Sequence, residues 1–289
     1  MTDDDHQMLD QPEETGFRSV PEPANTPSNS TQGYGPAHVL DHHPDYPHLH
    51  TIVFLHGRGS DAEEFAEELM DSSVLSDGRS LQEALPGWRW VFPTARQVWS
   101  EVFKEFMPMW FELSDGRDGD SEGLREAVTH VRSILQEERK RLGDYGKVIL
   151  GGISQGGAVG MWTVLSLMDE GNIDDDPGKW LGGFVGSSTW MPLGDDVEKM
   201  LDGGSEFVGH MMRSTLSQQA STIPVLMGHG VDDAYVEVDL GRQASRILSR
   251  VGCSVDWREY TGAEQEGHWF KAPEQMDHIY EFLKNLEAQ

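Results

Sequence analysis

The stretch VILGGISQGGAVGMW, residues 148–162, places five glycines around Ser154, between an apolar run and a helix-like run. Glycine weakens strands and helices, so several together indicate a backbone that bends sharply or passes close to another backbone. Gly152–Gly156 has the pattern G-x-S-x-G, after a predicted strand and before a helix predicted over Ala158 to about Met168. This context is typical of a nucleophile elbow, a strained turn that exposes a serine hydroxyl. We therefore predict that Ser154 is a nucleophile rather than an ordinary turn residue.

Strand and helix signals alternate on both sides of this stretch. Short apolar or alternating runs predict strands at Thr51–Leu55, Trp88–Phe92, Val148–Leu150, Phe184–Val185, Pro224–Met227 and Ser254–Tyr260. Helical spacing of apolar residues predicts helices over Leu124–Leu142 and Met276–Leu286. Strands separated by helices indicate one α/β domain, with a mostly parallel, twisted central sheet and helices on both faces.

The N-terminal part of the chain has a different composition. Residues 1–35 are rich in Pro, Ser, Asn, Thr and Glu, which predicts a disordered acidic tail, and residues 36–289 form the predicted domain. Five histidines lie between His38 and His50. Their irregular spacing among prolines favours a solvated connector over a metal site. A short strand near His38–Leu40 is expected to begin the fold.

Charge and cysteine content exclude several classes of protein. A formal net charge of −28 argues against nucleic-acid binding and against docking on anionic membranes. The single cysteine, Cys253, precludes an intramolecular disulfide. The start MTDDDHQMLD lacks the features of a secretory signal, and no apolar run is long enough to span a membrane. We expect a cytoplasmic protein without stable membrane insertion, metal or cofactor.

A nucleophilic serine needs a histidine base oriented by a carboxylate. His268 follows the predicted strand Ser254–Tyr260, in a loop where this architecture places catalytic groups, so we predict that it is the base. The acid is expected after Pro224–Met227, where Asp232 and Asp233 are both candidates that spacing alone does not separate.

The oxyanion of an acyl-transfer intermediate needs backbone N–H donors. One donor is expected at Gln155, the residue after the nucleophile. The second is expected from the Gly-rich turn in FLHGRGSDAEEF, residues 54–65, through the backbone N–H of Arg58. His56 in the same turn is predicted to orient the loop by hydrogen bonding rather than to act as a catalyst.

Five motifs in this order, FLHGRGSDAEEF, MPMWFEL, VILGGISQGGA, HGVDDAYV and EGHWF, resemble the acyl-protein thioesterase and carboxylesterase family of α/β-hydrolases, most closely its fungal branch. The resemblance implies that Asp233 is the triad acid and that Arg58 and Gln155 supply the oxyanion hole. It also implies that the segment 107–113 lies beside the acyl pocket, with Met107, Trp110 and Phe111 binding substrate. Plain core packing is the alternative for these aromatic residues.

The resemblance implies a cofactor-free serine hydrolase of carboxylic esters or S-acyl thioesters, acting through an acyl-enzyme, as a monomer or homodimer. Its substrate would be a small acyl ester or thioester or, in a narrower hypothesis, a lipidated protein. A lysophospholipase is another specific reading. A non-catalytic binding protein on the same scaffold is the alternative of a different class, disfavoured because every triad position is present. Residues 191–221 are long for a crossover and could form a lid.

Overall fold

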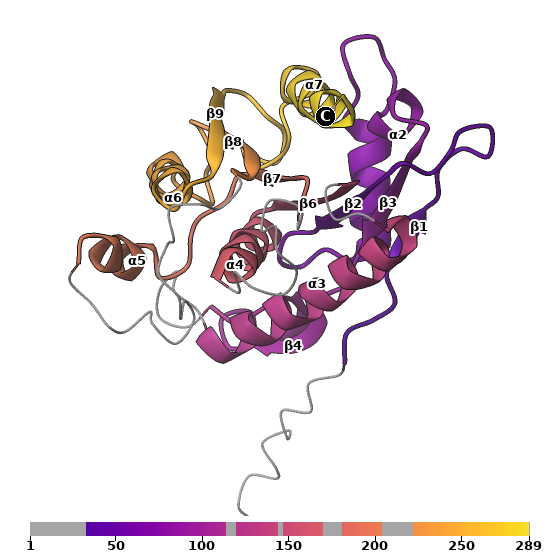
Figure 1. The fold of residues 1–289 in the computed structure, drawn as a ribbon. Coiled ribbons are helices and arrows are strands. Elements are labelled where there is room, and N and C mark those ends of the chain that lie inside the picture. The colour runs from indigo at the N-terminus through magenta and orange to yellow at the C-terminus, as the bar shows by residue number, and fades with distance from the viewer. Residues whose placement is uncertain (1–32, 114–119, 144–146, 170–180, 204–221, 289) are drawn as a thin grey trace, which may run out of the picture. The chain divides into compact units, whose positions relative to one another are not determined.

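A computed structural model describes residues 33–113, 120–143, 147–169, 181–203 and 222–288 of the 289-residue chain. Their framework is a seven-stranded sheet with the order β1-β3-β2-β6-β7-β8-β9 (Figure 1). β1 is antiparallel to β3, and the other neighbouring pairs are parallel. The strands are β1 (His38–Leu40), β2 (His50–Leu55), β3 (Trp88–Phe92), β6 (Val148–Ile153), β7 (Gly183–Ser187), β8 (Pro224–Gly230) and β9 (Ser254–Tyr260). The predicted mostly parallel sheet is confirmed.

Helices cover both faces of this sheet, as Figure 1 shows. One hydrophobic core joins the sheet to α3 (Ser121–Leu142), α4 (Gln155–Asp169), α5 (Gly194–Leu201) and α6 (Val238–Arg250). A second core joins the opposite face to α1 (Ala62–Glu67), the π-helical turn η1 (Glu68–Ser72), α2 (Leu81–Ala84) and α7 (Glu274–Glu287).

Strand β2 explains why a continuous apolar run was the correct signal for a strand. All six of its residues are buried. Val53 and Leu55 belong to the first core, and Ile52 and Phe54 belong to the second. Because successive side chains of a strand point to opposite faces, a strand covered by helices on both sides favours consecutive apolar residues, here Ile52–Leu55.

A hairpin between β3 and α3 was not predicted. It consists of β4 (Arg96–Ser100) and β5 (Glu105–Met109), which form a separate two-stranded antiparallel sheet. Charged residues interrupt its alternation, and Pro108 lies inside β5, where a two-stranded ribbon tolerates a residue without an N–H. The hairpin therefore carries little of the apolar signal that identifies strands of the main sheet.

Predicted helices and strands were found, mostly with longer bounds. α4 begins at Gln155, immediately after Ser154, whereas the sequence placed its start at Ala158. The proposed lid over residues 191–221 includes α5, but residues 204–221 lie outside the described residues, as do residues 1–32 of the predicted tail. Within the described ranges, no helix combines the length and apolar character needed to cross a membrane.

Candidate active site

Ser154 occupies a strained turn between β6 and α4. Its φ angle is +54°, in the left-handed region that side-chain-bearing residues rarely adopt. The turn is fixed on both sides of the strained residue, because Ser154 N–H donates to Ser187 O at 3.0 Å and its carbonyl accepts from Thr189 Oγ1 at 2.7 Å. The strain is therefore maintained by β7 and the segment after it, as expected for a nucleophile elbow.

The two glycines of the G-x-S-x-G pattern are required by close backbone approach. A Cβ atom on Gly152 would lie 2.5 Å from the Gly156 carbonyl carbon, and a Cβ atom on Gly156 would lie 2.4 Å from Leu55 O. Side chains at these positions would separate β6 from α4 and α4 from the end of β2. The pattern here is thus a packing requirement of the strand-to-helix turn.

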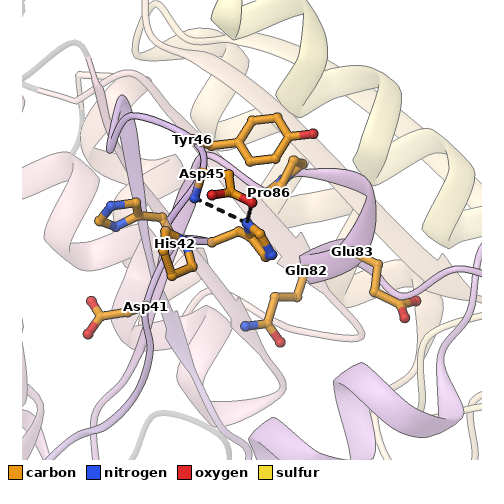
Figure 2. Close-up of a pocket in the computed structure, with 9 residues that line it drawn as sticks. Asp41, His42, Asp45, Tyr46, Gln82, Glu83 and Pro86 are labelled. Carbon is orange, nitrogen blue, oxygen red and sulfur yellow. Dashed lines mark hydrogen bonds and ion pairs between the residues drawn. The ribbon is translucent and has the colours of Figure 1, made fainter.

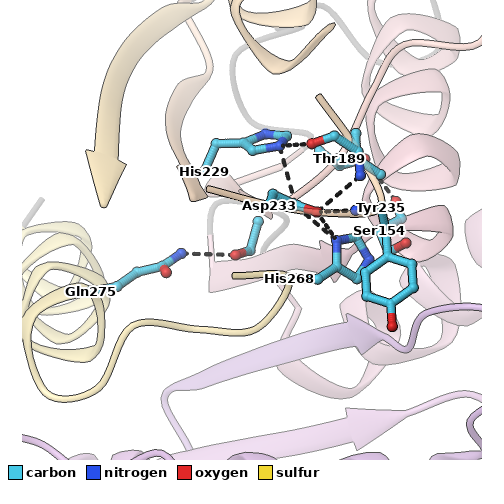
Figure 3. Close-up of polar contacts among 9 residues, drawn as sticks. Ser154, Thr189, His229, Asp233, Tyr235, His268 and Gln275 are labelled. Carbon is cyan, nitrogen blue, oxygen red and sulfur yellow. Dashed lines mark hydrogen bonds and ion pairs between the residues drawn. The ribbon is translucent and has the colours of Figure 1, made fainter. Parts of the chain in front are cut away.

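His268 and Asp233 form a close pair at the carboxyl ends of β8 and β9 (Figure 3). His268 Nδ1 lies 2.8 Å from Asp233 Oδ2 and 3.0 Å from Asp233 Oδ1. Because an ionised carboxylate only accepts hydrogen bonds, the proton is on Nδ1, and Nε2 is left as the basic nitrogen. Asp232 instead accepts from Gly262 N at 2.8 Å, and so holds the loop that carries His268.

Further groups hold the Asp233 carboxylate. Its Oδ1 accepts from the N–H groups of Tyr235 and Val236, each at 2.9 Å, and its Oδ2 lies 3.4 Å from His229 Nε2. Burial by itself would raise the pKa of Asp233, but hydrogen bonds from His229, His268 and Val236 outweigh it and hold the pKa well below its usual range. Asp233 is therefore ionised and can stabilise a positive charge on His268.

A cavity of about 560 Å³ brings the predicted site residues together. Its lining consists of Arg58, Leu113, Ser154, Gln155, Trp190, Tyr235, Val236, Gln265, Glu266 and His268. Asp233 lies behind His268, with its side chain fully buried. The serine, the imidazole and both predicted oxyanion residues thus share one space of the size that binds small organic ligands.

His56 orders the loop that carries Arg58. The ring is fully buried, and its Nε2 accepts from Ala95 N at 3.1 Å. The proton must therefore be on Nδ1, which donates to Gly57 O at 2.6 Å. Burial lowers the pKa of His56 to about 4, so the ring is neutral near pH 7. These contacts agree with the predicted role of His56 in orienting the loop.

None of the three predicted substrate-binding residues is among the residues that line the cavity. Trp110 and Phe111 are 0% and 1% exposed, within the core, and Met107 lies on β5 opposite Val98. Leu113, at the end of the same segment, lines the cavity. Trp110 and Phe111 are packed in the hydrophobic core, as the alternative prediction stated. Apolar character alone does not distinguish a buried aromatic residue from one that faces a ligand.

The sequence analysis did not predict several residues that line the cavity, although they are close in sequence to the predicted triad residues. Tyr235 and Val236 follow Asp233, and Gln265 and Glu266 precede His268. The Tyr235 ring lies 5.3 Å from the His268 ring and is 62% exposed, at the mouth of the cavity. Proximity to the triad positions was the signal that could have identified them.

A second cavity, of about 900 Å³, lies beside the His-rich segment and α2 (Figure 2). Its lining includes His42, His43, Asp45, Tyr46 and Glu83. Within the ranges that the structure describes, no three or more His, Cys, Asp or Glu side chains are grouped so as to hold a metal ion.

A mostly parallel sheet with a strained serine after one strand and a histidine–carboxylate pair after two others defines an α/β-hydrolase. Residues 41–287 match the phospholipase/carboxylesterase family model, and the chain belongs to that family. It is therefore a hydrolase of the carboxylesterase type.

Relatives and solved structures agree with this assignment. Acyl-protein thioesterase 1 of Gibberella zeae is 26% identical over 82% of this chain and 90% of its own length. Carboxylesterase SOBER1 of Arabidopsis thaliana is 26% identical over 73% of this chain and 81% of its own length. The crystal structure of Zea mays acyl-protein thioesterase 2 superposes with a TM-score of 0.65 and 26% identity, covering 88% of this chain and 99% of that chain.

Proposed function

We propose that the chain hydrolyses acyl esters and thioesters with Ser154 as nucleophile, His268 as general base and acid, and Asp233 as the residue that orients and stabilises His268. The observation that carries this proposal is the buried Asp233 carboxylate, 2.8 Å from His268 Nδ1, behind a cavity that His268 shares with the strained Ser154. No metal or cofactor is needed for this chemistry.

In the first half of the reaction, Ser154 Oγ attacks the acyl carbon and His268 Nε2 takes the hydroxyl proton. The carbonyl oxygen becomes an oxyanion, which the backbone N–H groups of Arg58 and Gln155 would bind. The intermediate then collapses: the bond to the leaving oxygen or sulfur breaks, and His268 donates the proton to that atom. A thiolate leaves more readily than an alkoxide, so the same groups can process both substrates.

In the second half, a water molecule replaces the leaving group. His268 accepts a proton from this water while the water oxygen attacks the acyl carbon. The bond between the acyl carbon and Ser154 Oγ then breaks, His268 returns the proton to Oγ, and the carboxylic acid is released. Imidazolium forms transiently in each half, and the ionised, buried Asp233 stabilises it.

The decisive experiment combines covalent labelling with turnover by wild type and Ser154→Ala. A fluorophosphonate probe should label wild type once per chain and should not label Ser154→Ala. Turnover of esters and thioesters should fall by about 10⁴-fold or more in this variant. Full activity in Ser154→Ala would contradict the assignment of the nucleophile. A matched series of oxygen esters and thioesters of increasing acyl length then defines the preferred substrate.

A narrower proposal is that the physiological substrate is an S-acylated protein in the cytoplasm. Its support is the similarity to proteins named acyl-protein thioesterase 1 and the charge of −28, which favours basic partners. In this proposal the acidic N-terminal residues help to select the basic substrate. Removal of residues 1–32 tests that role and retains Tyr34, whose ring stacks on His130 at 3.7 Å. The truncated chain should lose activity on a basic S-acylated protein and keep its activity on small thioesters. An equal loss of activity on both substrates, or no loss on either, would refute a role of these residues in substrate selection.

A further inference from the structure

The oxyanion loop is held from both sides by the end of β5. The indole Nε1–H of Trp110 donates to His56 O at 2.9 Å, and Gly59 N–H donates to Pro108 O at 2.8 Å. Arg58, which would supply one oxyanion donor, lies between these two contacts. The position of its backbone N–H therefore depends on residues 108–110, because few degrees of freedom remain between two fixed ends.

The second oxyanion donor is connected to the same segment. Gln155 is fully buried, and its side-chain Oε1 accepts from Trp110 N at 2.9 Å while its Nε2 donates to Phe111 O at 2.7 Å. These bonds orient the first residue of α4, whose backbone N–H has no acceptor within its own helix. The side chain of Gln155 thus attaches the start of α4 to the segment that also holds Arg58.

We propose that Trp110 is a positioning residue that fixes the spacing between the two oxyanion donors, the backbone N–H groups of Arg58 and Gln155. The inference rests on the proposed function and goes beyond it, because it assigns catalytic importance to a side chain that does not touch the cavity. Trp110 contacts the Arg58 loop through its indole and Gln155 through its backbone.

The hydrogen bond from the Trp110 indole to His56 O should hold the oxyanion loop rigidly. Without the indole N–H, His56 O loses a hydrogen bond inside the core, where an unpaired carbonyl is costly. The loop can recover a partner only by moving, and a small displacement of a preorganised donor costs far more in the transition state than in substrate binding. We therefore expect the effect of Trp110 in kcat rather than in KM.

The test compares Trp110→Phe with Trp162→Phe. Trp162 is a matched control, because it is also buried and its Nε1–H donates to a backbone carbonyl, Pro192 O, at 3.1 Å. After titration of active sites with a fluorophosphonate, Trp110→Phe should lower kcat by about 10- to 100-fold with KM within about twofold. The Ki of an alkyl trifluoromethyl ketone, whose bound hemiketal carries the oxyanion, should rise by the factor by which kcat/KM falls. Trp162→Phe should leave both constants within about twofold of wild type.

A second variant keeps the inference testable if Trp110→Phe does not fold. Gln155→Met removes both side-chain contacts to the segment and retains the backbone N–H, so it should lower kcat and raise Ki, as Trp110→Phe does. Because both side chains act through one segment, the double variant should lose less than the product of the single losses. Unchanged kcat and Ki in Trp110→Phe, or equal losses in Trp110→Phe and Trp162→Phe, would overturn the inference. Activity retained by Ser154→Ala would instead overturn the proposed function.

Discussion

The amino and carboxyl ends of the parallel strands each carry a cavity with a histidine–aspartate pair. At the amino end, before β2 and β3, His43 Nδ1 lies 3.8 Å from Asp45 Oδ2, and the two side chains are 56% and 86% exposed. At the carboxyl end, His268 and Asp233 lie 2.8 Å apart, with side chains 15% and 0% exposed. The residue types are the same, so the difference lies in burial and in the additional donors that reach Asp233. An aspartate withdrawn from water, with its oxygens hydrogen-bonded, orients an imidazole and stabilises its charge more strongly than an exposed one.

The largest expected effect is the loss of activity when the buried aspartate, Asp233, is replaced. Asp233→Asn should lower kcat by about 10⁴-fold, because an amide no longer enforces the tautomer in which Nε2 of His268 is basic. Steady-state kinetics on a short thioester, at several pH values, measure the loss.

Asp45→Asn is the control at the amino end. The exposed pair contributes little free energy, so kcat and KM should stay within about twofold of wild type. A comparable loss of activity in Asp45→Asn and Asp233→Asn would remove the distinction between the two ends of the sheet.

A smaller effect is expected in the pH dependence of stability. His56 is buried with a pKa of about 4, whereas an unfolded histidine has a pKa of about 6.5. Between these values the unfolded chain binds the additional proton, so the free energy of unfolding should fall by up to about 3 kcal/mol as the pH decreases from 7 to 4. Urea denaturation of wild type at pH 7 and pH 4 gives the total change, and the same measurement on a His56 variant isolates this component.

Replacing His56 should remove that component of the pH dependence. His56→Asn should be less stable than wild type at pH 7, yet lose less stability on acidification. His43→Asn, with a half-exposed side chain at the amino end, should retain the slope of wild type. A His56→Asn slope equal to that of wild type would show that His56 is not the buried group responsible.

The main sheet could be predicted because its central strands contain continuous apolar runs and its edge strand β9 alternates. A strand buried on one face alternates apolar and polar residues. Because β2 is buried on both faces, its apolar residues are consecutive. The β4–β5 hairpin gives no such signal, since Val102, Phe103 and Phe106 are exposed and Pro108 lies within a strand. Its contact with the oxyanion loop, from Gly59 N–H to Pro108 O, joins residues that are distant in sequence.

Site residues could be predicted where a sequence motif fixes the backbone conformation. They were harder to predict where the role of a residue depends on the direction of its side chain. Ser154 is marked by glycines that the turn requires. Asp232 and Asp233 could not be separated by spacing, because adjacent residues of one turn point in different directions. Asp233 reaches His268, and Asp232 reaches Gly262 N. Trp110 was expected in the acyl pocket, but its indole N–H is engaged by His56 O within the core.

The predicted triad and oxyanion residues follow four strands of the main sheet: β2, β6, β8 and β9. These strands are separated by long stretches of chain, and each parallel pairing closes a large loop before it gains contacts. β8 and β9 pair along all seven residues of each strand, and His268 follows that pairing. Recovery of hydrolysis during refolding should therefore coincide with completion of the carboxyl-terminal side of the sheet, which makes activity a late reporter of folding in this chain.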